Sequence, residues 1–227
     1  FDDTALASDD CSKLVMHEAW QGVATFTDVY DWSAAVCRGV FTDRAALKAA
    51  VDEWIADNSA AAAAHGPIAG WDVSRVDDLS GCCDDGSKGC EDSCDGFFPV
   101  GFNGDISAWD SSRVTTMDST FATDGSTMGS KFNQPLAWDT SQVTTLRYTF
   151  YNAEAFNQLL AWDTSAVTTI KDTFNNAIAF NQPLAWDTSS VTTIKSTFRN
   201  AKAFNSQLDW DTSSVTNMQG TFHEADA

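Results

Sequence analysis

Basic residues are scarce in this chain of 227 residues: 13 lysines and arginines stand against 32 aspartates and glutamates, a formal net charge of −19. Phosphate backbones and anionic lipid surfaces repel such a chain, which argues against nucleic-acid binding and against simple adhesion to an anionic membrane. No apolar run approaches the ~20 residues that span a bilayer, so we expect no membrane span. Hydrophobic residues nevertheless make up 43%, including nine Trp and fifteen Phe. This composition excludes a disordered acidic tail and supports a sizeable buried core.

Catalytic motifs are also missing. The three histidines are His17, His65 and His223, and the chain has no G-x-S-x-G, no H-E-x-x-H and no phosphate-binding glycine loop. It has no N-x-[ST] glycosylation sequon either. Carboxylates are plentiful, but most of those in the second half recur once per repeat, whereas an active site would be singular. We therefore expect no catalytic residue, no enzymatic activity and no organic cofactor.

The cysteines indicate an oxidising compartment. The chain has six cysteines: Cys11, Cys37, Cys82, Cys83, Cys90 and Cys94. The last four fall in the segment CCDDGSKGCEDSC. An even count in a charged, Trp-rich chain favours disulfides and a secreted or cell-surface location. A Cys₄ zinc site and free thiols are the alternatives, and the adjacency of Cys82 and Cys83 argues against a tetrahedral metal site. We expect Cys11 to pair with Cys37 and the other four to pair among themselves.

A tandem repeat dominates the second half of the chain. Trp-Asp dipeptides occur six times, at Trp71, Trp109, Trp138, Trp162, Trp186 and Trp210, and the last four are each 24 residues apart. The copies read FNQPLAWDTSQVTTLRYTFYNAEA, FNQLLAWDTSAVTTIKDTFNNAIA, FNQPLAWDTSSVTTIKSTFRNAKA and FNSQLDWDTSSVTNMQGTFHEADA. Self-similarity at such a period is the signature of stacked repeat architectures. One copy cannot offset its own conformational entropy, so stacking is obligatory.

The apolar positions indicate the kind of repeat. Leu184-Ala185-Trp186 has the period-2 alternation of a short strand, and Val191, Ile194, Phe198 and Ala201 follow it. This order resembles a leucine-rich repeat with Trp in the second Leu position and Ser in the Asn position. We therefore expect a leucine-rich-repeat-like solenoid of short parallel strands, one per ~24-residue repeat, with a helical cap at its N-terminal end.

The full motif F-N-x-x-L-x-W-D-T-S-x-V-T-x-[MLI]-x-x-x-F-x-x-A resembles that of BspA-like leucine-rich-repeat surface proteins, the repeat also typical of mycoplasma surface lipoproteins and found in algae and other protists. The stretch from Phe41 to Gly81, with a helix leading into a first W-D-x-S-x-V, is similar to the segment that precedes the repeats in such proteins. The resemblance covers residues 41–227 and implies a repeat scaffold on a surface or outside the cell, without enzymatic activity.

Three regions are expected along the chain. Residues 1–40 are irregular and disulfide-linked, residues 41–66 form the capping helix, and residues 67–227 form the solenoid, with a Cys-rich insertion at 82–101. For the helix we expect Thr42 as N-cap, an end at His65, and one buried face. That face contains Leu47, Ala50, Val51, Trp54 and Ile55. A smaller bulge is expected at 122–131.

Polar residues repeat in rows along the solenoid. The aspartate row Asp139, Asp163, Asp187 and Asp211, which Asp110 precedes, either binds calcium between turns or caps backbone N–H groups of the following turn. The Trp row either faces the core or forms a carbohydrate platform, and its alternation with Leu favours the core. We expect the Ser row (Ser112, Ser141, Ser165, Ser189, Ser213) and the Asn row (Asn133, Asn157, Asn181, Asn205) to be buried and bonded to backbone. Two Thr rows are expected to be exposed: Thr144, Thr168, Thr192, Thr216 and Thr149, Thr173, Thr197, Thr221.

Together these features predict a non-enzymatic extracellular or cell-surface scaffold, structural or adhesive, that joins a larger assembly through protein–protein contacts. The partners would be other protein subunits, including copies of itself in a filament or coat. The alternative is a calcium- or glycan-dependent adhesion module. Because the chain begins at Phe1 rather than Met, we expect a processed chain or the ordered part of a longer one. Trp210, Val215, Met218 and Phe222 should form an open apolar end that further repeats or a neighbouring subunit cover.

Overall fold

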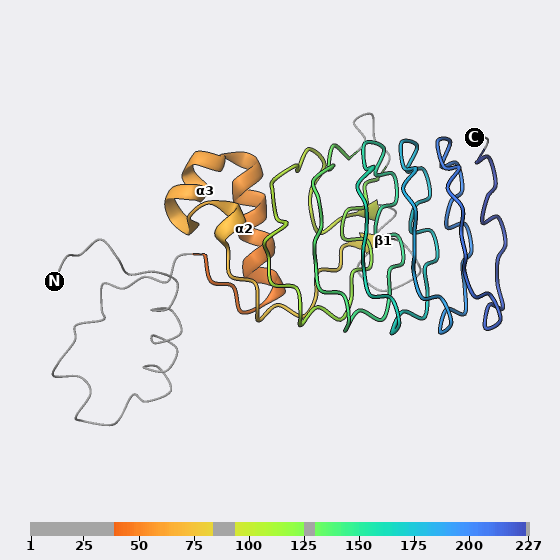
Figure 1. The fold of residues 1–227 in the computed structure, drawn as a ribbon. Helices are drawn as coiled ribbons and strands as arrows, with labels where there is room; N and C mark the ends of the chain where they lie inside the picture. The colour runs from red at the N-terminus through yellow and green to blue at the C-terminus, as the bar shows by residue number, and fades with distance from the viewer. Residues whose placement is uncertain (1–38, 84–93, 125–129, 226–227) are drawn as a thin grey trace, which may run out of the picture.

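The computed structural model describes residues 39–83, 94–124 and 130–225. Its helices are α2 (Arg44–Ala56), α3 (Asn58–His65) and a 3₁₀ turn, η1 (Ile68–Gly70), and its named strands are the two-residue pair β1 (Cys82–Cys83) and β2 (Cys94–Asp95). β1 and β2 pair antiparallel, with Cys83 opposite Cys94. The described residues after β2 form a series of coils that lie side by side, with α2 and α3 at one end (Figure 1). Neither helix in this part of the chain is long and apolar enough to cross a membrane.

Each 24-residue repeat forms one coil, and single parallel bridges link the coils. The ladder runs through Asp78, Thr116, Thr145, Thr169, Thr193 and Asn217. Backbone hydrogen bonds continue it: Ile170, Asp172, Phe174 and Asn176 each donate to the next coil. The prediction that Leu184–Trp186 is the strand is wrong, because the bridge lies in the Val191–Ile194 segment instead. That segment is rich in β-branched residues, which favour extended pairing.

The core is one continuous stack of rings and aliphatic side chains from Phe41 to Phe204. In successive coils Phe150 and Phe174 are 5.4 Å apart with planes 3° apart, and Trp162 and Trp186 are 6.2 Å apart, also at 3°. Neighbouring coils are therefore related by a translation with very little rotation.

The helical region differs from its prediction in three ways. Asp43, not Thr42, caps α2, and its side chain accepts a hydrogen bond from the backbone N–H of Ala46. The helix breaks at Asp57, which caps α3 by accepting from Ser59 and Ala60. Leu47, Ala50 and Val51 are buried as expected, but Ile55 is 37% exposed. The break turns α3 back, so that His65 Nε2 lies 2.9 Å from Glu53 Oε2.

The Cys-rich insertion contributes to the core at its C-terminal side. Phe97 and Phe98 are buried, and the ring of Phe98 stacks on Phe121 at 5.0 Å. Cys82 is disulfide-bonded. Cys11, Cys37 and Cys90 lie outside the described residues, so the pairing scheme stays a prediction.

Candidate functional site

The Trp row belongs to the scaffold. The five tryptophans from Trp71 to Trp186 that begin Trp-Asp dipeptides are at most 5% exposed, which confirms that the row faces the core. Each indole N–H donates to a carbonyl earlier in the chain, as Trp162 does to Leu136 and Trp186 to Leu160. A buried indole ring whose N–H is hydrogen-bonded inside the stack has no exposed face on which a sugar could stack.

The acidic row, defined as Asp139, Asp163, Asp187 and Asp211, is exposed. Each carboxylate accepts, through Oδ1, the backbone N–H of the serine two residues later, at 2.8–3.0 Å. This confirms the predicted backbone-capping role. The serine hydroxyl is the largest cause that lowers the pKa of Asp163 and Asp187, and the serine backbone N–H is the largest cause for Asp139 and Asp211.

Calcium binding by the acidic row gains no structural support. Within the described residues, no group of three or more His, Cys, Asp or Glu side chains is close enough to hold a metal ion. Bridging calcium stays a prediction that a titration can test.

Two other rows differ from their predicted burial. The Ser row is largely exposed, as at Ser165 and Ser189. The preceding threonines Thr140, Thr164 and Thr188 are buried instead. The Asn row bonds to backbone as predicted but is not buried: Asn157 donates its backbone N–H to Asn133 Oδ1 at 2.9 Å, and later coils repeat this bond.

Of the two Thr rows, the structure exposes one. Thr168 and its equivalents are exposed, with hydroxyls that donate to the preceding coil. The row of Thr149, Thr173 and Thr197 is fully buried, so the prediction that it is exposed is wrong. Its hydroxyls donate to core carbonyls, as Thr173 Oγ1 does to Leu146 at 2.8 Å. The invariant residues are thus largely engaged in holding coil to coil.

The repeats differ mainly at surface positions that follow the bridge ladder. Two residues after the bridge the copies carry Arg147, Lys171 and Lys195, which we call the basic row. Further along, Tyr151 corresponds to Asn175 and Arg199, and Glu154 corresponds to Ile178 and Lys202. All five basic residues of 140–227 occupy these variable positions. In a repeat protein, side chains that do not hold neighbouring repeats together are the ones available to bind a partner.

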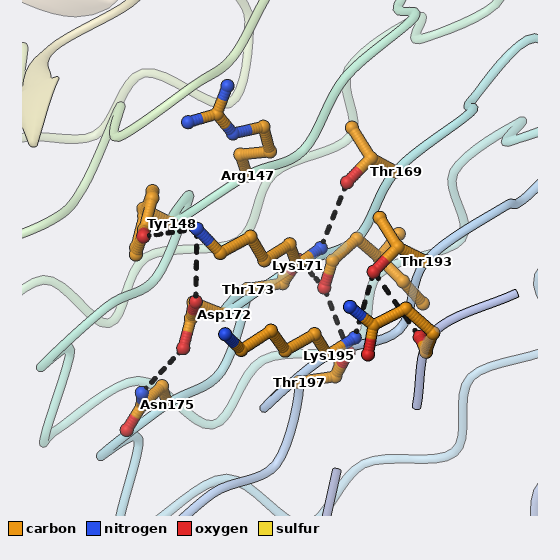
Figure 2. Close-up of polar contacts among 12 residues, drawn as sticks. Arg147, Tyr148, Thr169, Lys171, Asp172, Thr173, Asn175, Thr193, Lys195 and Thr197 are labelled. Carbon is orange, nitrogen blue, oxygen red and sulfur yellow. Dashed lines mark hydrogen bonds and ion pairs between the residues drawn. The ribbon is translucent and has the colours of Figure 1, made fainter. Parts of the chain in front are cut away.

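A polar cluster occupies the middle of this variable face (Figure 2). Lys171 Nζ donates to the Tyr148 hydroxyl at 2.8 Å and lies 3.9 Å from Asp172 Oδ2. Asn175 Nδ2 donates to Asp172 Oδ1 at 2.7 Å. The side chains of Lys171 and Lys195 extend side by side in the same direction (Figure 2). The cluster combines ammonium groups, a phenol and an amide, which can recognise anionic or hydrogen-bonding groups.

Burial raises the pKa of one group in the cluster and of one neighbouring group on the variable face. It raises the pKa of Asp172, against the lowering effects of Asn175, Lys171 and Lys195. It also raises the pKa of the half-buried Tyr151, with a further contribution from Asp172. Tyr148 and Asp172 have left-handed backbones, with φ 55° and 56°.

The predicted site residues do not include this cluster, because they are residues that recur in every copy. The missed signal was present in the alignment of the four repeats, where the same positions read Arg, Lys, Lys and Gln, then Tyr, Asp, Ser and Gly. The structure brings these positions together on one face, while the acidic row lies eight residues earlier in each coil.

The comparisons with known proteins gave one family. A family model described as "Mycoplasma protein of unknown function, DUF285" matches residues 38–136, 59–182 and 126–227. The overlapping matches together cover the helices and all of the coils. Neither the curated proteins nor the solved structures gave a match.

Proposed function

This chain belongs to the DUF285 family of Mycoplasma proteins of unknown function, and from that premise we propose that it is a non-enzymatic scaffold displayed outside the cell. In this proposal the stack is a leucine-rich-repeat-like solenoid that joins a larger assembly through protein–protein contacts. Membership in this family, the disulfide bond at Cys82 and the resemblance to surface repeat proteins support the location.

The observation that carries the proposal is the division between scaffold and surface within each coil. The invariant Trp, Phe and Thr side chains hold neighbouring coils together, and the variable positions place a concentrated set of cations on an otherwise acidic molecule. Arg, Tyr and Lys side chains gathered on one face of an acidic molecule suit the recognition of a protein surface by complementary charge.

Cross-linking on intact cells of the source organism tests this function. An amine-reactive, membrane-impermeant reagent should label the chain from outside. Intermolecular cross-links should concentrate at Lys171, Lys195 and Lys202 on the variable face. Lys48, in α2 at one end of the stack (Figure 1), is the internal control.

A chain that the reagent does not reach on intact cells would contradict the surface location. Cross-links spread evenly over all lysines would contradict the variable face as the contact. Binding that depends on calcium or glycans, measured by calorimetry and on a glycan array, would favour the adhesion module instead.

A further inference from the structure

The acidic row and the basic row have the same period along the stack. Both repeat every 24 residues: Arg147, Lys171 and Lys195 stand eight positions after Asp139, Asp163 and Asp187, and Gln219 takes that position after Asp211. The rings of successive coils are nearly parallel, at 3–4° for Phe174–Phe198, Trp186–Trp210 and Phe180–Phe204. Coils that translate without rotating keep each row straight, so charges of opposite sign lie on two straight, equally spaced lines.

Both rows present charge to the outside. The acidic carboxylates are exposed and use Oδ1 for their serines. In the basic row, the Lys171 side chain is 27% exposed, and Lys195 is partly exposed with no ion pair among the described residues. The exposed Arg199 and Lys202 add to the same face. The Lys171 and Lys195 side chains run in parallel, and the Lys171 Nζ contacts Tyr148 and Asp172 within the stack (Figure 2).

We propose that the acidic row of one copy docks along the basic row of a second copy, so that copies of this chain associate side by side. This rests on the proposed scaffold function and names its partner. A second copy carries a row of the opposite charge at an identical spacing, so that a match at one coil is repeated at the next. Each exposed ion pair contributes little alone, so specificity requires several pairs in register. The contact joins two different surfaces, so each copy keeps one row free for another.

The first experiment measures the mass of the purified full chain against salt. At about 0.1 M salt, repulsion from the net charge is screened beyond ~10 Å while ion pairs in contact persist. The weight-average mass by sedimentation should then exceed the 24.6 kDa monomer. At about 1 M salt, where the screening length is ~3 Å, it should return to the monomer value.

Charge reversal tests the rows themselves. Lys171→Glu/Lys195→Glu and Asp163→Lys/Asp187→Lys should each weaken self-association at least about tenfold. Mixing the two variants should restore it, since one then carries two acidic rows and the other two basic rows. Arg113→Glu/Lys131→Glu makes the same charge change at exposed positions outside the rows and should leave association unchanged. If a reversed variant misfolds by circular dichroism, Lys171→Gln/Lys195→Gln takes its place and should weaken association as well.

The outcomes separate this inference from the proposed function. A monomer at 0.1 M salt and high concentration overturns self-docking, while cell-surface cross-links from Lys171 and Lys195 to a different protein would still support the scaffold function. Association that survives 1 M salt and the basic-row variant, but is lost in Met218→Asp, also overturns it. Met218 and Phe222 are 55% and 54% exposed, and such a result would assign the contact to that apolar coil.

Discussion

Asn176 shows how one residue type solves two problems in each coil. Its backbone is left-handed, with φ 61°, a conformation that Asn and Gly tolerate better than other residues. Its side-chain Nδ2 donates to Asn152 Oδ1 at 2.7 Å, and its own Oδ1 accepts from Asn200. The Asn side chains thus form a ladder on a corner where the backbone turns.

Replacing Asn176 separates these two roles. Asn176→Ala should lose both side-chain bonds and place a Cβ-bearing residue without a polar group in the left-handed region, at a total cost of about 2–4 kcal/mol. Asn176→Gly loses the same bonds but fits the backbone, so it should cost about 1 kcal/mol less than Ala. Urea denaturation of both variants measures the difference. Equal stabilities, or Ala above Gly, would show that the backbone conformation is not the constraint.

Asp172 is a buried carboxyl whose pKa is raised, mainly by desolvation. A raised folded-state pKa contributes stability that is fully present below the unfolded pKa and is lost as pH rises through the folded value. Asp172→Asn mimics the protonated form and can keep its contact with Asn175. We expect the variant to be more stable than the native chain at pH 7, with the difference closing toward pH 3.

Asp163 provides the matched control, because its serine lowers its pKa. Its stability contribution is present above the unfolded pKa and is lost as pH falls, so Asp163→Asn should change stability in the opposite direction at pH 7. Thermal melts of both variants from pH 3 to 7 test the pair. Parallel pH profiles for the two would contradict the assignment of burial to one and hydrogen bonding to the other.

Trp186 tests the core role of the aromatic row. It is 4% exposed, and its ring lies 6.2 Å from both Trp162 and Trp210. Trp186→Ala should cost ~3–5 kcal/mol through the cavity it leaves. Trp186→Phe keeps a ring in the stack and loses the indole donor, so its cost should be clearly smaller. An unchanged denaturation midpoint for the Ala variant would contradict burial of the row.

At the scale of elements, the break between α2 and α3 depends on Asp57. Its carboxylate accepts from the backbone of Ser59 and Ala60, each at 3.0 Å. Asp57→Ala should destabilise the chain by about 0.5–2 kcal/mol, and Asp57→Asn, which keeps a capping oxygen, by a few tenths at most. Hydrogen exchange should locate the Ala effect in α3. Protection of α3 unchanged by Asp57→Ala would show that tertiary contacts alone set the break.

The elements also show where sequence reasoning succeeds. The 24-residue period and the inward Trp and Phe positions were predictable, because apolar spacing directly reports burial. The helix break was not, because the pattern from Asp43 to His65 contains neither Gly nor Pro. The structure has the Asp57 cap at the break and places His65 against Glu53 and Phe41. The strand position was wrong because Leu184-Ala185-Trp186 has the apolar alternation of a strand, whereas the bridge between coils forms at Thr193, within Val-Thr-Thr-Ile.

The candidate site was missed at the level of sequence for a different reason. The repeat pattern singles out invariant residues, and most of these are buried in the stack or bonded to a neighbouring coil. Thr173 illustrates the problem: its spacing suggested an exposed hydroxyl, whereas the coil turns it fully inward to bond Leu146. Only the three-dimensional arrangement brings Tyr148, Lys171 and Asp172 from adjacent coils into one cluster.

For the whole molecule, the repeated unit should be removable. Deleting residues 156–179 joins Ala155 to Phe180 and lets coils that were two apart meet through equivalent contacts. We expect a folded, cooperative protein with a lower denaturation midpoint and a smaller m-value, since less surface is exposed on unfolding. Deleting residues 156–167, half a unit, should prevent folding of the stack. Similar circular dichroism and melting for the two deletions would contradict translational equivalence of the coils.

The near-absence of rotation between coils has a consequence for the gene as well as for the protein. Because the junctions between the last four coils are nearly equivalent, unequal recombination between these repeats would yield a chain that is longer or shorter by a whole coil and otherwise sound. Each such event moves both charged rows together and leaves their mutual offset unchanged. Length can therefore vary among descendants of one gene while the proposed lateral fit between copies is preserved.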